Sequence, residues 1–379
     1  MGKIQRNLKA REESFFLLGP RGTGKSTWLK MTYPEAVTID LLNTETASFL
    51  RANPTRLTGI VEGNPGAKTF IIDEVQLIPE LLFEVHALME HKPSTQFILT
   101  GSSARKLKRT GTDLLGGRAL KIDMHPFTAA ELGADFSLDD ALNFGLLPVI
   151  HAARDPMARL SAYIGLYLRE EIQMEGLVRN LGPFTRFLEA ASFSHGSQLN
   201  ASDIARDCGA GRTTVDGYLK LLYDLMIASV LPVFSKRAKR ELVSKGKFYF
   251  FDAGVYRTLR PKGPLDRPSE IDGAALEGLV FQNLRAMLDS QGVDNGLYFW
   301  RTVAGNEVDF VVYAENRFDA IEVKNAAKVT RSDMTSLKSF KSDYPEARLL
   351  LLYRGTLQYE EDGVLVMPVE RFLRNPQPT

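Results

Sequence analysis

A glycine-rich loop near the N-terminus constrains this chain more than any other feature. The apolar run Phe15-Phe16-Leu17-Leu18 is followed by Gly19-Pro20-Arg21-Gly22-Thr23-Gly24-Lys25-Ser26 and then by Thr27-Trp28-Leu29-Lys30. This is the pattern G-x-x-x-x-G-K-[ST] between a predicted strand and a predicted helix, which is the setting that such a loop requires. The sequence therefore predicts an α/β fold that binds a nucleotide.

The residue types of the loop indicate how phosphates would be held. Glycines let backbone N–H groups wrap around phosphate oxygens, and the start of the following helix adds the positive end of its dipole. Lys25 is expected to reach the β- and γ-phosphates, and Ser26 is expected to ligate Mg²⁺. ATP and Mg²⁺ are thus the expected cofactors. The predicted contact residues are Gly19, Pro20, Arg21, Gly22, Thr23, Gly24, Lys25, Ser26 and Thr27.

An acidic pair supplies what ATP hydrolysis needs besides the loop. Phe70-Ile71-Ile72 is followed by Asp73-Glu74, so Asp73 is expected at the carboxyl end of a strand next to that of the loop, holding Mg²⁺ through water. Glu74 is expected to polarise the attacking water. Thr100 ends another predicted strand and is expected to touch the γ-phosphate or that water, although a simple strand-to-loop turn is the alternative. Further strands are predicted at 37–40 and 119–123.

The amino-acid composition indicates a soluble globular protein. The chain has 379 residues, 44% of them apolar and 25% charged, as in soluble globular proteins of two or three domains. Its apolar runs are about half of the ~20 residues that a membrane helix needs, and the N-terminus lacks an apolar leader. Its single cysteine, Cys208, excludes an internal disulfide and a thiolate metal cluster. We expect a cytoplasmic protein without membrane contact.

The middle of the chain carries a predicted nucleic-acid-binding element. Residues 138–178 have helical periodicity and are expected to pack rather than react. After them come two short predicted helices joined by Gly209-Ala210-Gly211, followed by β-rich segments at 227–234 and 248–251. This order is typical of a winged helix-turn-helix, which binds either DNA or another protein.

Local basic patches would have to provide any attraction for DNA, because the net charge is only +1. Such patches occur at 105–121 and 236–247, and a solvated loop is the alternative for each. The predicted DNA-binding residues are Arg212, Thr213, Thr214, Lys236, Arg237, Lys239 and Arg240.

The last third contains a predicted hairpin with an acidic face. Strands at 307–313 and 318–324 surround the turn Ala314-Glu315-Asn316-Arg317, so opposed residue numbers should sum to 631. Alternation then places Glu307, Asp309, Glu322 and Lys324 on one face. The other face would be apolar and consist of Val308, Phe310, Val312, Ile321 and Val323.

Opposed carboxylates on this face require compensation. Asp309 facing Glu322 would destabilise the sheet unless a divalent cation lay between them. Lys324 would then position a water or stabilise the transition state, and Glu277 from the preceding helix would complete the set. The alternative is an ordinary solvated hairpin in which Glu307 pairs with Lys324.

These motifs together resemble a bacterial and archaeal subfamily of AAA-type ATPases that carries a C-terminal domain of the PD-(D/E)XK nuclease type. The resemblance covers nearly the whole chain and is carried by 19–26, 70–76, 100–103, 114–118 and 125–132, with the D…E-x-K set of Asp309, Glu322 and Lys324. It implies an AAA+ parallel sheet, a helical lid and a homo-oligomer, expected to be a hexameric ring. Arg118 is implied as an arginine acting on a neighbouring subunit's ATP, with Arg105 as a competitor.

The expected organisation has four parts: an ATPase core at 1–135, a helical lid at 136–180, a winged helix at 181–258 and a restriction-endonuclease-like α/β domain at 259–379. The leading hypothesis is Mg²⁺-dependent ATP hydrolysis coupled to the binding and processing of DNA, with a nuclease-type site. A motor that remodels duplex or branched DNA without cutting it is the second hypothesis. A regulatory ATPase switch that binds a protein partner is the third.

Overall fold

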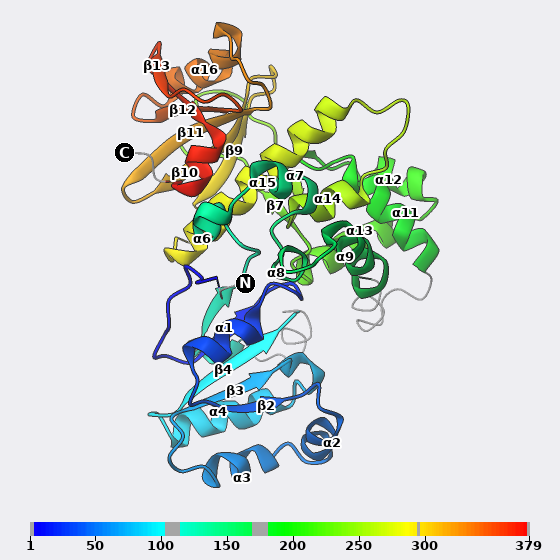
Figure 1. The fold of residues 1–379 in the computed structure, drawn as a ribbon, viewed down its shortest axis with the longest axis vertical. Coiled ribbons are helices and arrows are strands. Elements are labelled where there is room, and N and C mark those ends of the chain that lie inside the picture. The colour runs from blue at the N-terminus through cyan, green and yellow to red at the C-terminus, as the bar shows by residue number, and fades with distance from the viewer. Residues whose placement is uncertain (1–3, 103–113, 169–180, 294–295, 377–379) are drawn as a thin grey trace. The chain divides into compact units, whose positions relative to one another are not determined.

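The chain divides into two compact units in the computed structural model, which describes residues 4–102, 114–168, 181–293 and 296–376. The N-terminal unit comprises Arg6–Pro126 together with Tyr223–Ile227. The C-terminal unit comprises Phe127–Leu222 and Ala228–Thr379, with Met1–Gln5. Figure 1 colours the chain by residue number along both units.

The N-terminal unit is built on a parallel sheet in the strand order β2-β3-β4-β1-β5. The predicted strands are confirmed to within a residue at either end. However, β4 lies between β1 and β3, so the strand that ends at Asp73 is not the direct neighbour of the loop strand. The elements are β1 (Phe15–Leu18), α1 (Lys25–Thr32), β2 (Val37–Asp40), α2 (Thr44–Ala52), α3 (Arg56–Glu62), β3 (Thr69–Asp73), η1 (Val75–Leu77), α4 (Leu81–His91), β4 (Gln96–Gly101), η2 (Leu114–Gly117) and β5 (Leu120–Asp123).

Both faces of this sheet are covered, which explains its continuous apolar strands. Alternate residues of β1 enter separate cores. Phe16 and Leu18 pack in the core that includes residues of α2, α3 and α4, whereas Phe15 and Leu17 pack with Trp28 of α1. The sheet is thereby held rigidly from both sides, and its carboxyl edge is a fixed platform for polar side chains.

The first half of the C-terminal unit is mainly helical and includes a small sheet in the order β6-β8-β7. The two helices predicted on either side of Gly209 appear as α12 and α13, and Gly209 adopts a left-handed conformation with φ 65°. Residues 169–180 of the predicted lid lie outside the described residues, and the four-part division stays a prediction. The elements are α6 (Ala129–Leu132), η3 (Gly133–Asp135), α7 (Leu138–Phe144), α8 (Pro148–His151), α9 (Pro156–Ala162), η4 (Tyr163–Leu168), α11 (Leu181–Ser192), β6 (Ser197–Gln198), α12 (Ala201–Cys208), α13 (Arg212–Asp224), β7 (Ala228–Leu231), β8 (Lys247–Phe250) and α14 (Ala253–Leu259).

The second half of this unit begins with a long helix, α15, and contains a mixed sheet in the order β13-β14-β12-β11-β10-β9. Strands β9, β10 and β11 are antiparallel neighbours, whereas β12 joins β11 in parallel after α16. The elements are α15 (Pro268–Ser290), β9 (Leu297–Arg301), β10 (Glu307–Ala314), β11 (Arg317–Lys324), η5 (Arg331–Met334), α16 (Thr335–Asp343), β12 (Arg348–Tyr353), β13 (Tyr359–Glu361), β14 (Val364–Pro368) and α17 (Val369–Arg374).

The predicted hairpin register is confirmed from Ala314↔Arg317 to Phe310↔Ile321, where opposed numbers sum to 631. The predicted alternation is wrong at Val308. Pairing of β10 with β9 shifts between Val308 and Val311, and both of these residues enter the same core. Phe310 packs instead beside Phe281 of α15. A β-bulge of this kind turns side chains away from strict alternation, so the predicted apolar face is divided between two surfaces.

Candidate functional site

The phosphate-binding loop has the conformation that its glycines allow. Gly22 and Gly24 have φ angles of 83° and 92°, a region that is costly for residues with a Cβ. The loop leads into α1, where the N–H of Trp28 donates to the carbonyl of Gly24 at 2.9 Å. Lys25 is buried, and its Nζ donates to the carbonyl of Gly19 at 2.7 Å. The lysine is therefore anchored within the loop.

Side chains from α1, β3 and β4 converge beside this loop. The hydroxyl of Ser26 donates to Oδ2 of Asp73 at 2.9 Å. The Thr100 hydroxyl donates to the other oxygen, Oδ1 of Asp73, and accepts the backbone N–H of Glu74 at 3.0 Å. Because β4 is the neighbour of β3, Thr100 is placed to bond both residues of the acidic pair. The structure thus brings the predicted residues Ser26, Asp73, Glu74 and Thr100 together.

Glu74 is held by Gln76, which lies in the matching segment 70–76 but was given no role from the sequence. The backbone of Glu74 is left-handed, with φ 60°, which directs the chain sharply out of β3. The amide Nε2 of Gln76 donates to Oε2 of Glu74 and to the hydroxyl of Ser102 at 3.1 Å. Gln76 is buried, and a Cβ at Gly101 would lie 2.6 Å from its Oε1. Glycine at position 101 therefore leaves room for the amide, and the amide fixes the carboxylate.

The oxygen donors in this cluster suit Mg²⁺. A hydroxyl and a carboxylate already 2.9 Å apart are hard ligands of the kind that Mg²⁺ prefers, and it usually takes its other ligands from phosphates and water. Ser26 and Asp73 would hold the ion, and Lys25 would face the phosphates. An ion held there would neutralise part of the negative charge of the phosphates.

Arg118 lies on the surface of the N-terminal unit. Its guanidinium is 2.5 Å from Oε1 of Glu90 on α4, and both side chains are about half exposed. The alternative arginine, Arg105, lies outside the described residues.

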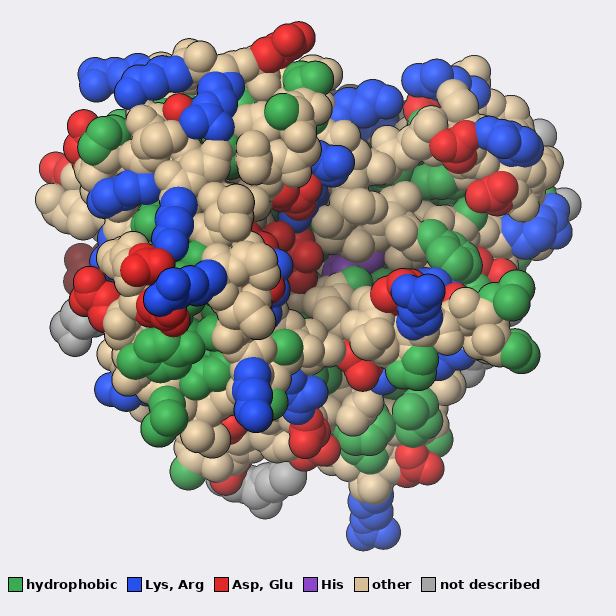
Figure 2. Space-filling model, turned by 90° about the horizontal axis from the view of Figure 1, so that it is seen from above, with side chains coloured by type: hydrophobic (Ala, Val, Ile, Leu, Met, Phe, Trp, Pro, Cys, Tyr) green, Lys and Arg blue, Asp and Glu red, His purple; other side chains and the backbone are tan. Residues whose placement is uncertain are grey.

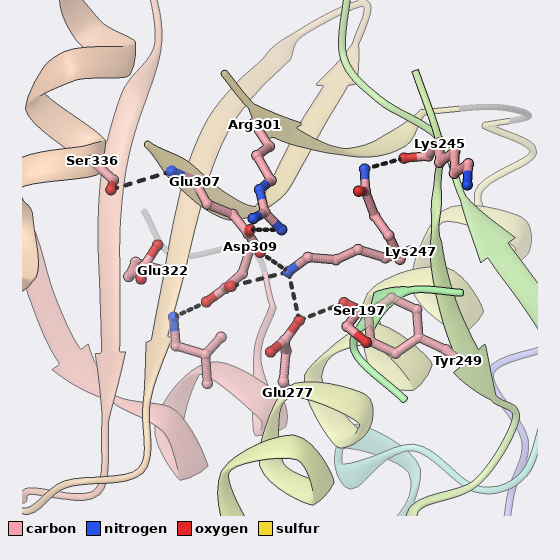
Figure 3. Close-up of polar contacts among 12 residues, drawn as sticks. Ser197, Lys245, Lys247, Tyr249, Glu277, Arg301, Glu307, Asp309, Glu322 and Ser336 are labelled. Atoms are coloured by element: carbon pink, nitrogen blue, oxygen red, sulfur yellow. Dashed lines mark hydrogen bonds and ion pairs between the residues drawn. The ribbon is translucent and has the colours of Figure 1, made fainter. Parts of the chain in front are cut away.

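The second predicted site lies at the bulged end of β10, and a lysine from β8 stands at its centre. Lys247 Nζ is 2.9 Å from Oε1 of Glu277, 2.5 Å from Oε1 of Glu307 and 3.3 Å from Oδ1 of Asp309. Figure 3 shows the ammonium between these carboxylates, which come from α15 and β10. The lysine side chain is only 2% exposed.

Neighbouring groups orient the carboxylates. The Tyr249 hydroxyl donates to Oε1 of Glu277 at 2.5 Å, and Arg301 lies 3.2 Å from Oε2 of Glu307. Asp309 Oδ2 accepts the backbone N–H of Val323 at 2.9 Å. Each of these acidic side chains is thus oriented by a second contact besides the lysine.

Burial and neighbouring charges both shift the pKa values of Glu277 and Lys247. Burial raises the pKa of Glu277 to about 7, although Lys247 opposes this effect. For Lys247, burial alone would lower the pKa, but the charge of Glu277, with those of Tyr249, Asp309 and Glu307, raises it well above its ordinary value. The lysine therefore stays protonated.

The predicted metal site of Asp309 and Glu322 is arranged differently from the expectation. Glu322 is buried and pairs with Lys324 at 2.7 Å, and Figure 3 shows it apart from the lysine-centred cluster. Burial, followed by the charge of Asp309, raises the pKa of Glu322 well above its usual range. The alternative pairing of Glu307 with Lys324 is wrong, because Glu307 contacts Lys247 and Arg301. Among the described residues, no set of three or more His, Cys, Asp or Glu side chains is placed to hold a metal.

A divalent cation does not fit the centre in this arrangement. An ion between Asp309 and Glu322 would have to approach Asp309 to roughly 2.0–2.6 Å, but Oδ1 of Asp309 already lies 3.3 Å from the ammonium of Lys247 and its Oδ2 accepts the N–H of Val323. The sequence placed Lys247 in a basic patch and gave it no role. The available signal was its position directly before Phe248-Tyr249-Phe250, since a lysine that leads a buried strand needs a buried partner.

The predicted DNA-binding residues have mixed surroundings. Arg212, Thr213 and Thr214 are exposed at the start of α13, where Arg212 donates to the Ser202 hydroxyl. Lys236 lies over the ring of Tyr313, and Arg240 is 3.1 Å from Asp343. Arg237 and Lys239 are exposed. On the face in Figure 2, Lys and Arg alternate with Asp and Glu rather than forming one basic surface.

Family models match successive parts of the chain. Residues 11–133 match a model described as an AAA domain. The N-terminal unit carries an AAA-type ATPase domain. Residues 135–266 and 272–372 match models described as domains of unknown function, DUF8612 and DUF4143. The boundary between the last two falls beside the start of α15.

Three proteins with similar sequences are uncharacterized. Those of Mycobacterium tuberculosis and Mycobacterium bovis are each 28% identical over 368 residues, which is 94% of this chain and 80% of theirs. One from Haemophilus influenzae is 23% identical over 322 residues, which is 80% of this chain and 77% of that protein.

Solved structures show only a remote likeness. The replication initiator DnaA bound to AMPPCP and single-stranded DNA gives a TM-score of 0.31 at 16% identity, over 57% of this chain and 84% of that one. AMPPCP-bound DnaA from Aquifex aeolicus gives 0.31 at 14% identity, over 57% and 83%. Within the described part of this chain, no helix combines the length and apolarity needed to cross a bilayer.

Proposed function

We propose that this protein is a Mg²⁺-dependent ATPase whose nucleotide cycle is coupled to DNA binding. The observation that carries the proposal is the convergence of Ser26, Asp73, Thr100 and Glu74 beside the phosphate-binding loop. Nucleotide binding alone would need the loop and a metal ligand. A second carboxylate, Glu74, held by the buried amide of Gln76, is what hydrolysis requires in addition.

In this proposal each residue has a separate role. Lys25 neutralises charge on the β- and γ-phosphates, and Ser26 and Asp73 hold Mg²⁺. Glu74 orients and activates the attacking water. Thr100 keeps the acidic pair in register by bonding both the Asp73 carboxylate and the backbone N–H of Glu74.

The DNA-binding part of the proposal rests on the helix-turn-helix. The order α11, β6, α12, α13, β7, β8 and the sheet order β6-β8-β7 support assignment as a winged helix. Arg212, Thr213 and Thr214 lie in the exposed first turn of α13, where side chains of a recognition helix meet base edges. Arg237 and Lys239, both exposed, are the patch residues best placed for phosphate contact.

Homo-oligomerisation is part of the same proposal. Arg118 is half exposed on a surface of the N-terminal unit, where its contact with Glu90 is an exposed ion pair. Exposed pairs of this kind are worth at most about 1 kcal/mol, so the arginine is readily released towards a neighbouring subunit's ATP.

A second candidate function is ATP-driven remodelling of DNA without cleavage, and it is favoured by one observation. The ammonium of Lys247 occupies the centre of the nuclease-like carboxylates. With Lys247 in this position, the domain would bind DNA but would not cleave it. The C-terminal order α15, β9, β10, β11, α16, β12 supports its assignment to the restriction-endonuclease type.

The test measures phosphate release at saturating ATP and Mg²⁺, with and without duplex and four-way-junction DNA. We expect Glu74→Gln to lower kcat by roughly 10²-fold or more while ATP binding is kept, and Lys25→Ala to weaken binding itself. Glu80→Gln and Lys30→Ala, at exposed positions of the same unit, are the matched controls. Normal turnover in Glu74→Gln would refute the role given to Glu74, and a wild-type protein that releases no phosphate would refute the ATPase assignment.

The reactions that contain DNA test whether ATP turnover is coupled to DNA and whether the DNA is cleaved. We expect DNA to raise turnover, and Arg212→Ala to reduce that stimulation without changing the DNA-free rate. Turnover that ignores both DNA substrates would refute the coupling. Denaturing gels of the same reactions report cleavage, which the second candidate function excludes.

A further inference from the structure

Lys247 Nζ donates hydrogen bonds to Glu277 and Asp309 and forms an ion pair with Glu307. An ammonium has three N–H donors and no acceptor, and Glu277, Glu307 and Asp309 offer one oxygen each within 3.3 Å. The side chain is 2% exposed, so water does not compete for these donors. The ring of Phe299 lies 5.6 Å from the same nitrogen and closes a further side. These contacts form a binding site for one cation.

The acidic set needs that cation for its own stability. Glu277 and Asp309 are 18% and 12% exposed, and isolated carboxylates at such depth are costly. Arg301 contacts Oε2 of Glu307, whereas Lys247 contacts Oε1 of the same side chain. Lys247 is therefore the group that balances the inner carboxylates.

The cation comes from a different part of the fold than the carboxylates. Lys247 begins β8, which pairs with β6 and β7, whereas the carboxylates belong to α15 and β10. Glycine at position 246 is needed for this placement, since a Cβ there would lie 2.3 Å from Val230 Cγ1. Tyr249, two residues along β8, donates to the same Glu277 oxygen. Two side chains of one strand thus insert into the acidic centre.

We propose that Lys247 is a resident cation that takes the place of a divalent metal ion in the nuclease-like centre, so that the centre joins β8 to α15 and β10 instead of cleaving DNA. Metal and lysine exclude one another here, because an ion between Asp309 and Glu322 would need Oδ1 of Asp309, which the ammonium of Lys247 already contacts. The inference does not depend on ATP hydrolysis. It concerns which cation these carboxylates bind.

The first experiment compares thermal unfolding of nucleotide-free wild type, Lys247→Met and Lys245→Met, with and without Mn²⁺. Methionine keeps the length of the apolar stem and removes the charge, and Lys245 is an exposed lysine two residues away. We expect Lys247→Met to lower Tm by on the order of 10 °C, and Mn²⁺ to restore part of the loss. Wild type and Lys245→Met should show only the response that Mn²⁺ at Ser26 and Asp73 would produce in all three proteins. A Lys247→Met protein with unchanged Tm and no Mn²⁺ response beyond that of wild type would overturn the proposal.

A second measurement remains decisive if Lys247→Met does not fold. Mn²⁺ is titrated into wild type and Asp309→Asn, and bound ion is followed by electron paramagnetic resonance. Any Mn²⁺ at Ser26 and Asp73 is common to both proteins, so only the difference reports the acidic centre. We expect the two titrations to coincide. A binding event in wild type that disappears in Asp309→Asn would show that the metal displaces Lys247, and would overturn the proposal.

Discussion

The buried histidine of the C-terminal unit makes stability depend on pH in a direction that can be worked out. His195 lies just before β6, with its ring stacked on Tyr256 at a centroid distance of 4.1 Å. Its Nδ1 accepts the backbone N–H of Phe250 at 3.1 Å, so this nitrogen carries no proton in the folded state. Burial lowers the pKa of His195 to about 3, and a backbone contact with Ala274 opposes this effect.

The direction of the pH effect follows from the number of protons that His195 binds in the folded and unfolded states. The unfolded chain binds a proton at His195 with a pKa near 6.5, whereas the folded chain does so only near 3. Between these values the unfolded state holds more protons, so the free energy of unfolding decreases as the pH decreases. From pH 7 to pH 5 the loss is about 2 kcal/mol, and it reaches roughly 5 kcal/mol once both states are protonated.

Asp252 changes the free energy of unfolding in the opposite direction as the pH decreases. Its contribution must therefore be separated from that of His195. Burial raises the pKa of Asp252 to about 6, so the folded state gains protons before the unfolded state does, and acidification stabilises it. The readout is therefore the difference between wild type and His195→Asn. An asparagine oxygen can accept the same Phe250 N–H but does not titrate.

The assay is urea unfolding at pH 7 and pH 5, followed by tryptophan fluorescence in a Trp28→Phe background. This leaves Trp300 of β9, in the same unit as His195, as the reporter, because the chain has two tryptophans. We expect wild type to lose about 2 kcal/mol more than His195→Asn between the two pH values. Equal losses in the two proteins would refute the assignment of a neutral, buried histidine.

Two further predictions follow from close contacts. Gln76→Leu should lower kcat for ATP on the order of tenfold with little change in KM, because the amide of Gln76 donates hydrogen bonds to Glu74 and Ser102. An unchanged kcat would contradict this positioning role. Gly278→Ala should destabilise the C-terminal unit by about 1–3 kcal/mol in urea unfolding, because the added Cβ would lie 2.2 Å from Nε2 of the stacked His195 ring. Gly273→Ala, in the same helix with open space around it, is its control and should not destabilise.

Local patterns predicted the strands of the N-terminal unit, but not their order in the sheet. A loop such as Gly19–Ser26 needs a preceding strand and a following helix, and both were readable from neighbouring residues. The hairpin of β10 and β11 was also predictable, because a short turn sets the pairing by arithmetic. The bulge at Val308 was not, since it depends on how β9 and α15 pack on the two sides.

The roles of Gln76 and Lys247 required contacts between segments distant in sequence. Gln76 reads as an ordinary residue after an acidic pair until β4 places Ser102 beside it. Lys247 reads as the last residue of a basic patch. It lies 30 residues before Glu277 and 62 before Asp309, and no periodicity links positions so far apart.

The sequence by itself thus determined which functional groups are available: a phosphate-binding loop, an acidic pair at the end of a strand and a set of carboxylates on a hairpin. The tertiary structure alone decided which charges meet. Glycine, strand and turn preferences act within a few residues, so they can be read locally. The partner of a buried carboxylate is chosen by the whole fold, because desolvation requires a charge of opposite sign from whichever segment can reach it. Here that segment is β8, and the partner is Lys247.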